Sequence, residues 1–122
     1  MIPGVVPSTL SVMIVDDEAP ARARLRDLLA DIGPQLTNEV VCEAADGLAA
    51  LTLIERRRID VLLVDIRMPG MDGIELARHL LHCERRPAVV FVTAFDAYAV
   101  RAFELNAVDY LLKPVRAQRL LA

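Results

Sequence analysis

The sequence has few cysteines, no excess of positive charge and no long apolar run, and each of these features excludes a class of protein. The 122 residues contain two cysteines, Cys42 and Cys83, whose wide separation suits neither a metal site nor a redox pair, so we expect two reduced thiols in a cytosolic protein. The net charge of −3 leaves no basic surface for nucleic acid, although this says nothing about a domain fused to the chain. No apolar run approaches membrane-spanning length, so we expect no membrane partner.

The N-terminal segment also lacks the features of a targeting signal. The first residues, MIPGVVPST, contain no basic residue and two prolines, so residues 1–9 are expected to be a disordered lead-in. We expect residues 10–122 to form one globular domain, because a chain that is 55% apolar and 25% charged can bury a full core. Lysine is nearly absent: among 14 basic residues, Lys113 alone carries a compact ammonium group.

Short apolar runs alternate with helical patterns along the chain, which predicts five strand–helix units. The expected strands are 10–16, 39–44, 59–65, 88–94 and 108–112. The expected helices are 20–33, 47–58, 74–84, 96–106 and a fifth from 115 that is truncated at Ala122, where the natural chain either continues or has been trimmed. Strands buried on both faces and separated by helices indicate an α/β fold, a doubly wound three-layer sandwich around a five-stranded parallel sheet.

Several residues predict how the helices begin, end and pack. Pro20 suits a first helical turn and Gly33 a C-terminal stop, and Asp46 is placed to cap the second helix. Asp72, in the turn sequence GMDG, is interpreted as a turn residue and not as a site residue. The apolar stripe of the first helix is expected to contain Ala21, Leu25, Leu28, Leu29 and Ile32.

Polar residues follow the expected strands at the ends where ligands bind in such sheets. Asp16 and Asp17 follow the first strand, Asp65 ends the third, Thr93 lies near the end of the fourth, and Lys113 follows the fifth. Because the carboxyl ends of parallel strands meet at one edge, these side chains are expected to share a pocket. Two adjacent acids after a buried strand repel one another, so this pocket requires a counter-charge.

The chemistry of this residue set favours a phosphate reaction at a magnesium ion. Carboxylate oxygens suit Mg²⁺, which commonly completes its coordination with waters and phosphate oxygens. Lys113 and Thr93 offer a positive charge and a hydrogen bond to a phosphoryl group. Asp65, between the metal and the lysine, is therefore a candidate nucleophile that would form an aspartyl phosphate.

Four motifs, in order, resemble one family across nearly the whole chain: IVDDE, LLVDIRMPGMDG, FVTA and YLLKP. Together they are similar to the receiver domains of two-component response regulators. That resemblance implies a flavodoxin-like strand order of 2-1-3-4-5. It also implies a signalling switch that is phosphorylated by a sensor histidine kinase, with slow autodephosphorylation at most, and not a turnover enzyme.

The resemblance also implies a role for each motif residue. Asp65 would be the phosphoacceptor, and Asp17 and Asp65 would bind Mg²⁺, or Mn²⁺ in its place, together with the backbone carbonyl of Arg67. Asp16 would assist the metal through a water molecule.

The remaining motif residues would contact or sense the phosphoryl group. Thr93 and Lys113 would contact it, and Tyr110 would be the aromatic residue that changes position during switching. The bond between Lys113 and Pro114 would be cis, a geometry that a peptide bond before proline tolerates at low cost.

A longer segment, VTAFDAYAVRAFELNAVDYLLKPV, is similar to receivers of the LytR/AlgR type. In these proteins the output is a LytTR DNA-binding domain, so the resemblance implies transcriptional control in the bacterial cytoplasm. No such domain lies within these 122 residues, and DNA would be reached only through it. A possible partner is a second copy of the chain, in a homodimer through helix 96–106 and the fifth strand. That helix is apolar nearly all round, so two interpretations stay open: an exposed surface that binds a partner, or a helix that is well buried in the domain.

Two other function classes compete with the switch. A magnesium-dependent phosphohydrolase of the haloacid-dehalogenase kind also uses an aspartyl phosphate, but it carries its acids as D-x-D on the first strand, whereas Asp16 and Asp17 are adjacent. A phosphorylation-independent interaction module would not need the complete set of acids, hydroxyl and lysine. A metal site at His79, His82 and Glu75 is considered less favoured than a solvated helix face.

Overall fold

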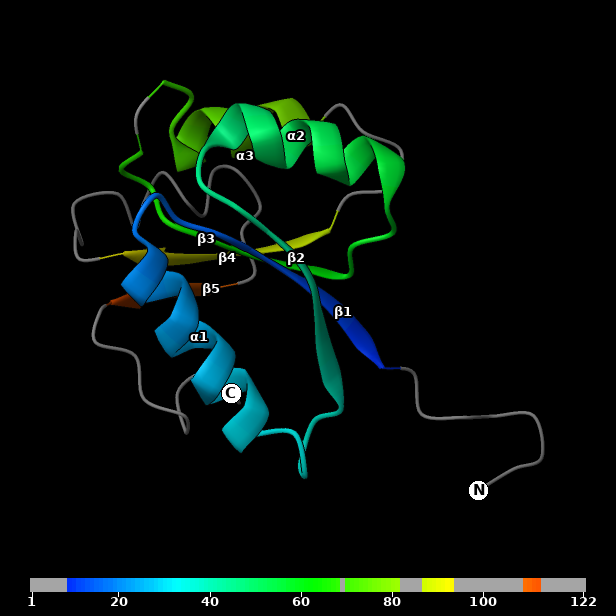
Figure 1. Ribbon diagram of the computed structural model, residues 1–122. Helices are drawn as coiled ribbons and strands as arrows, with labels where there is room; N and C mark the ends of the chain where they lie inside the picture. The colour runs from blue at the N-terminus through cyan, green and yellow to red at the C-terminus, as the bar shows by residue number, and fades with distance from the viewer. Residues whose placement is uncertain (1–8, 69, 82–86, 94–108, 113–122) are drawn as a thin grey trace.

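The computed structural model of the chain shows a five-stranded parallel sheet with helices on both of its faces (Figure 1). The structure describes residues 9–68, 70–81, 87–93 and 109–112, the last segment by its backbone. In chain order the elements are β1 Leu10–Val15, α1 Ala19–Asp31, β2 Asn38–Ala44, α2 Gly47–Arg56, β3 Val61–Val64, α3 Gly73–Leu80, β4 Ala88–Thr93 and β5 Asp109–Leu112. The strand order β2-β1-β3-β4-β5 confirms the expected fold class. The expected helices at 96–106 and 115–122 lie outside the described residues.

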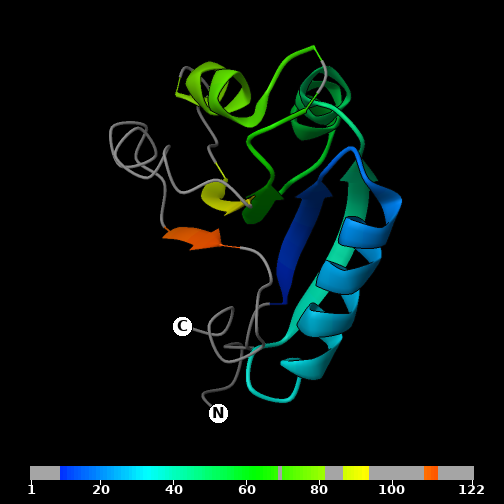
Figure 2. The same cartoon turned by 90° about the vertical axis from the view of Figure 1, so that its left-hand side faces the viewer.

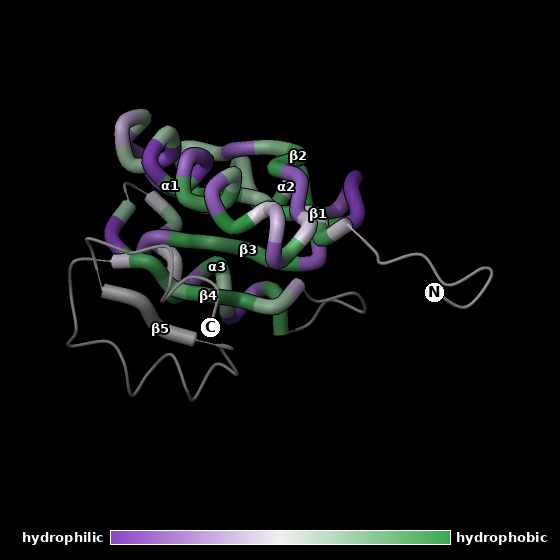
Figure 3. Tube along the Cα trace, turned by 90° about the horizontal axis from the view of Figure 1, so that it is seen from below, coloured by the Kyte–Doolittle hydropathy of each residue, from purple (hydrophilic) through white to green (hydrophobic). Residues whose placement is uncertain are grey.

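The helices divide the core into two layers, one on each side of the sheet (Figure 2). Side chains alternate along a strand, so Met13 and Val15 of β1 pack under α2 and α3, whereas Val12 and Ile14 pack under α1. All four are at most 2% exposed. The apolar sequences of β3 and β4 run through the middle of the molecule (Figure 3), as expected for parallel strands covered on both faces.

Helix α1 buries a narrower stripe than the sequence predicted. Leu25 and Leu29 are buried, with Ile32 just beyond the helix, whereas Ala21 and Leu28 are only half-buried. Pro20 lies in the first turn, as expected. The helix ends at Asp31: the amide of Ile32 still donates to the carbonyl of Leu28, four residues back, whereas the amide of Gly33 donates to Ala30, only three residues back.

Side-chain caps begin the two helices on the opposite face. Asp46 accepts a hydrogen bond of 2.8 Å from the amide of Ala49, which confirms its predicted role at the start of α2. Asp72 does the same for the amide of Glu75 at the start of α3, at 2.9 Å. Asp72 therefore has a structural role, in agreement with its interpretation as a turn residue.

Strand β3 and helix α2 are shorter than predicted at their shared connection. The expected strand began at Ile59, but β3 begins at Val61, and Asp60 instead bonds to residues at the starts of β1 and β4. Its carboxylate accepts from the amide of Ser11 at 2.9 Å, and its carbonyl accepts from Ala88 at 2.9 Å. Arg57 has left the helical conformation, and its guanidinium donates to the carbonyl of Val41 at 2.8 Å. With these long-range contacts, α2 ends earlier and β3 begins later than their local sequences indicate.

Candidate functional site

Asp16 and Asp65 leave the sheet side by side at the carboxyl ends of β1 and β3. The two strands pair in register with Val15 opposite Val64, so the residue after each strand reaches the same edge. The backbone holds both positions: Asp65 donates its amide to Val15 at 2.9 Å, and Asp16 donates its amide to Ala44 of β2 at 3.1 Å. The expected convergence of these two strand ends is therefore observed.

Three carboxylates gather at this edge of the sheet. Asp16, Asp17 and Asp65 each offer one oxygen, and these oxygens all lie within 4.8 Å of one another. Asp16 is 1% exposed and Asp65 9% exposed, whereas Asp17 is open to solvent. Oxygen ligands at this spacing, with one open side, fit a Mg²⁺ ion that keeps some of its waters. Within the described ranges, they are the only group of three or more acids, histidines or cysteines placed to hold a metal.

Local hydrogen bonds orient the two buried acids. Oδ1 of Asp16 accepts from the amide of Glu18 at 3.0 Å, in the short turn that leads into α1. Oδ1 of Asp65 faces the amide of Arg67 at a longer 3.4 Å. Each acid thus accepts from an amide two residues later, at the start of its own loop.

The fourth and fifth strands reach the same edge. Val64 lies opposite Phe91, so Thr93 stands one residue beyond the level of Asp65 on the neighbouring strand, and it is fully buried. Leu112 of β5 pairs with Thr93, and Lys113 is the next residue in the sequence. Lys113, Pro114 and the side chain of Tyr110 lie outside the described residues.

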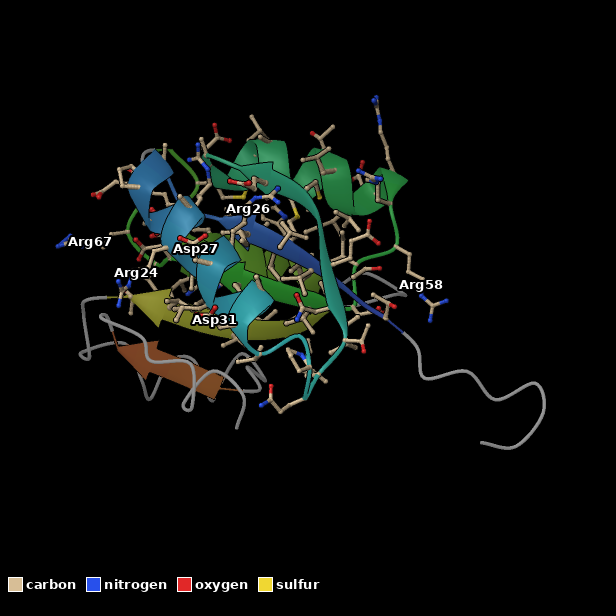
Figure 4. The ribbon with its side chains drawn as sticks, turned by 60° about the horizontal axis from the view of Figure 1, so that its bottom comes forward. Arg24, Arg26, Asp27, Asp31, Arg58 and Arg67 are labelled. Carbon is tan, nitrogen blue, oxygen red and sulfur yellow. The ribbon has the colours of Figure 1, made fainter. Side chains whose placement is uncertain are left out.

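The loop from β3 to α3 folds tightly back onto Asp65. Gly73 donates its amide to the carbonyl of Ile66 at 2.8 Å, and Gly70 adopts φ +71°, a conformation that favours glycine. A Cβ atom on Gly73 would lie 2.3 Å from the carbonyl oxygen of Asp65, so only glycine fits at this contact. Arg67, two residues after Asp65, is exposed, and its side chain extends away from the ribbon (Figure 4).

An arginine that the sequence reasoning missed contacts the site from α1. Nη1 of Arg22 donates to the backbone carbonyl of Asp16 at 2.7 Å, and its Nε donates to Glu43 of β2 at 3.0 Å. Arg26, one turn later, donates to the other oxygen of Glu43. The hydrogen bond from Arg26 is the main cause that lowers the pKa of Glu43, and Arg22 adds to it. Arginines on a charged helix give no sequence signal of such a contact.

Other polar residues considered from the sequence do not join the site. His79 and Glu75 are exposed on α3, which agrees with a solvated face, and His82 and Cys83 lie outside the described residues. Cys42 is a half-buried free thiol, and burial raises its pKa. Among the described residues, no helix is both long and apolar enough to cross a membrane.

Similar proteins share both the sequence and the fold of this chain. The chain is 48% identical over 113 residues to the positive alginate biosynthesis regulatory protein of Pseudomonas aeruginosa, which covers 91% of this chain and 44% of that protein. It is 44% identical over 111 residues to the transcriptional regulatory protein BtsR of Escherichia coli, which covers 91% and 45%. The chain thus spans less than half the length of these relatives.

Solved structures lead to the same family. The response regulatory domain of mrkE from Klebsiella pneumoniae superimposes with a TM-score of 0.84 at 36% identity, covering 92% of this chain and 89% of that one. The family model described as the response regulator receiver domain matches residues 12–122. A match over nearly the whole chain, with strand ends arranged as described above, shows that this chain belongs to the family of response regulator receiver domains of two-component systems.

Proposed function

We propose that this domain is a Mg²⁺-dependent switch in which Asp65 is the phosphoacceptor. A sensor histidine kinase or a small phosphodonor would phosphorylate it. Receiver domains are signalling domains, generally work with histidine kinases and output domains, and generally bind Mg²⁺ at an acidic pocket. The observation that carries the proposal is the acidic cluster, whose three carboxylates offer oxygens within 4.8 Å of one another beside the buried Thr93.

The metal would be held by this chain's own oxygens. Asp17 and Asp65 would bind Mg²⁺ or Mn²⁺ directly, with the carbonyl of Arg67, and Asp16 would act through a water. When bound, the ion supplies positive charge that offsets the charge on the phosphoryl oxygens. The exposed position of Asp17 supports this assignment, because it leaves a side of the cluster open for waters and the phosphodonor.

The reaction would take place at a carboxylate oxygen of Asp65. That oxygen forms a bond to phosphorus while the bond from phosphorus to the donor's histidine nitrogen breaks, and the imidazole takes up a proton as it leaves. Lys113 and the hydroxyl of Thr93 would bind oxygens of the transferred group.

Switching would follow from the new phosphoryl group. Thr93 would move toward it and Tyr110 would follow into the vacated space, so that phosphorylation shifts a balance between two populated states. Helix 96–106 and β5 would carry the readout, and a homodimer through this face is the form we propose for the active state.

We place the output of the whole protein in transcription. Two relatives, the alginate biosynthesis regulator and BtsR, are named as regulators, and each is more than twice as long as the matched segment. A LytTR-type DNA-binding domain outside this chain would make the DNA contact, in the cytoplasm. The phosphohydrolase alternative is not favoured, because the receiver family accounts for residues 12–122.

Arg67 is proposed to influence loss of the phosphoryl group. It is exposed and lies two residues after Asp65, where a long side chain can obstruct the attacking water. Arg67→Ala is expected to change the dephosphorylation rate of the phosphorylated domain, followed by mass spectrometry after removal of the donor. Equal rates in Arg67→Ala and the parent would refute this role.

Intact-mass spectrometry tests the proposed function directly. The parent chain, incubated with acetyl phosphate and Mg²⁺, is expected to gain one phosphoryl group, and the gain should vanish with EDTA or in Asp65→Asn. Asp46→Asn is the matched control, because it removes an acid away from the site while asparagine still caps α2. A parent chain that binds Mg²⁺ but gains no mass from acetyl phosphate or a phosphorylated kinase would favour the phosphorylation-independent module.

A further inference from the structure

Behind the acidic cluster lies a second charged group, which joins α1 to β1 and β2. It consists of Arg22, Glu43 and Arg26. Arg22 is half-buried, with 21% of its side chain exposed, and donates both to Glu43 at 3.0 Å and to the carbonyl of Asp16 at 2.7 Å. Arg26, between α1 and β2 (Figure 4), is 48% exposed and contacts Glu43 only through its Nε. The two arginines therefore share a partner, but of the two only Arg22 also donates a hydrogen bond to the strand end that carries the acids.

The contact at Asp16 fixes the peptide unit between the two adjacent acids. Strand β1 ends at Val15, and the amide of Asp16 still pairs with Ala44, so the carbonyl of Asp16 is the first group to leave the sheet. A rotation of that peptide unit would move the carboxylates of Asp16 and Asp17 relative to Asp65. A guanidinium bound on its other side to Glu43 is a rigid anchor against such a rotation.

We propose that Arg22 is a positioning residue for the metal site, holding the carbonyl of Asp16 so that the carboxylates of Asp16 and Asp17 stay within coordinating distance of Asp65. This inference rests on the proposed function, in which those acids bind Mg²⁺. Arg22 acts through the backbone, and Glu43 holds its guanidinium in place and offsets part of its charge.

The sign of the effect separates positioning from simple electrostatics. Removing a positive charge near three carboxylates should strengthen the binding of a cation if charge alone matters. Loss of positioning should weaken it, since loss of groups that orient metal ligands typically lowers affinity by about tenfold or more. Arg26→Ala removes the same charge from the same helix and the same partner, so it is the matched control.

Isothermal titration calorimetry of the whole chain with Mg²⁺ gives the test. We expect the Kd to rise about tenfold in Arg22→Ala and to change less than about twofold in Arg26→Ala. A second pair, Arg22→Lys and Arg26→Lys, keeps the charge at both positions, but only Arg22→Lys removes a guanidinium that bonds on two sides. We expect Arg22→Lys to weaken binding about threefold and Arg26→Lys to leave it unchanged. Urea unfolding of each variant confirms that it is folded at the titration temperature.

Each outcome decides the proposal. If Arg22→Ala does not fold, the lysine pair gives the answer, because a lysine keeps the apolar part and the charge of the side chain. Equal Mg²⁺ affinities within both pairs, or tighter binding in Arg22→Ala than in the parent, would overturn the positioning role while leaving the metal site intact. A parent chain that binds no Mg²⁺ would overturn the proposed metal site and this inference together.

Discussion

The carbonyl oxygen of Asp65 touches Gly73 so closely that no other residue fits there, which links the phosphoacceptor candidate to the start of α3. A Cβ atom added at Gly73 would lie 2.3 Å from that oxygen and 2.9 Å from the Cα of Ile66. Both are backbone atoms, which cannot rotate away as a side chain would. The start of α3 can therefore approach the end of β3 this closely only because Gly73 has no side chain.

Gly73→Ala is therefore expected to lower the free energy of unfolding by about 1–3 kcal/mol, because the added methyl must displace the backbone of β3 or α3. It should also weaken Mg²⁺ binding, since Asp65 belongs to the displaced segment. Urea unfolding and calorimetry would measure both effects. Gly70→Asn is the control, because asparagine tolerates positive φ and nothing lies within 4 Å of the added atom. Equal stability of Gly73→Ala and the parent would contradict the prediction.

Glu43 gives a pH-dependent contribution to stability. Its pKa is lowered by its hydrogen bonds with Arg26 and Arg22, so the ionised form stabilises the folded state. For a lowered pKa, this stabilisation is present above the unfolded value of about 4.3 and is lost as the pH falls through the folded value. We expect Glu43→Gln to cost about 0.5–1 kcal/mol at pH 7 and nothing once the parent is protonated.

Urea titrations of Glu43→Gln and the parent from pH 7 downward would show this convergence below about pH 4. Glu39→Gln, at an exposed glutamate of the same strand, should differ little from the parent across the whole range. A stability difference for Glu43→Gln that persists unchanged at low pH would mean that packing, and not charge, accounts for it.

At the scale of the element, side-chain caps decide where α2 begins. The carboxylate of Asp46 satisfies the amide of Ala49, one of the donors that the first turn leaves without a helical partner. Asp46→Ala is expected to lower the free energy of unfolding by about 1 kcal/mol, whereas Asp46→Asn should retain most of it. Thermal unfolding followed by circular dichroism measures the difference. Equal destabilisation by both variants would show that the charge matters more than the cap.

The ends of helices and strands were predicted correctly where they depend on residues close in the sequence. They were predicted incorrectly where they depend on contacts between distant residues. The caps at Asp46 and Asp72 and the proline at the start of α1 act within a few residues, so the sequence indicates them directly. The early end of α2 depends on Arg57 reaching the carbonyl of Val41, and the late start of β3 depends on Asp60 bonding to Ser11. Neither partner is near in the sequence, so no local pattern revealed them.

At the scale of the whole molecule, metal binding and folding should be coupled. Three carboxylates held within 4.8 Å repel one another in the folded state, and Mg²⁺ would relieve that repulsion. We expect Mg²⁺ at 100 times its Kd to raise the free energy of unfolding by about 2.7 kcal/mol. Urea unfolding with Mg²⁺ and with EDTA at equal ionic strength tests this expectation.

Asp17→Asn is expected to change the free energy of unfolding in opposite directions without and with Mg²⁺. In EDTA it should be more stable than the parent, by up to about 1 kcal/mol, because one of the repelling charges is gone. With Mg²⁺ it should lose most of the added stability, because a ligand is gone too. Asp27→Asn, at an exposed acid of α1, should behave like the parent in both conditions (Figure 4). A parent chain whose free energy of unfolding does not change with Mg²⁺ would count against the metal site.

The sequence by itself determined the architecture of this domain and which residues meet at the carboxyl edge of its sheet. Apolar strands alternating with helices can bury both faces of a sheet only in a layered parallel arrangement, and parallel strands necessarily bring the residues after β1 and β3 to one edge. The pattern of acids at those ends therefore predicted that Asp16, Asp17 and Asp65 would meet, although their roles stay predictions.

Only the tertiary structure decided how that edge is supported. The contact of Arg22 with the carbonyl of Asp16 joins residues of α1 and β1, and its second contact adds Glu43 of β2. The close approach of Gly73 to Asp65 depends on the path of a whole loop. A sequence pattern records which residues are polar or apolar, whereas these contacts depend on the distances that packing sets between separate elements.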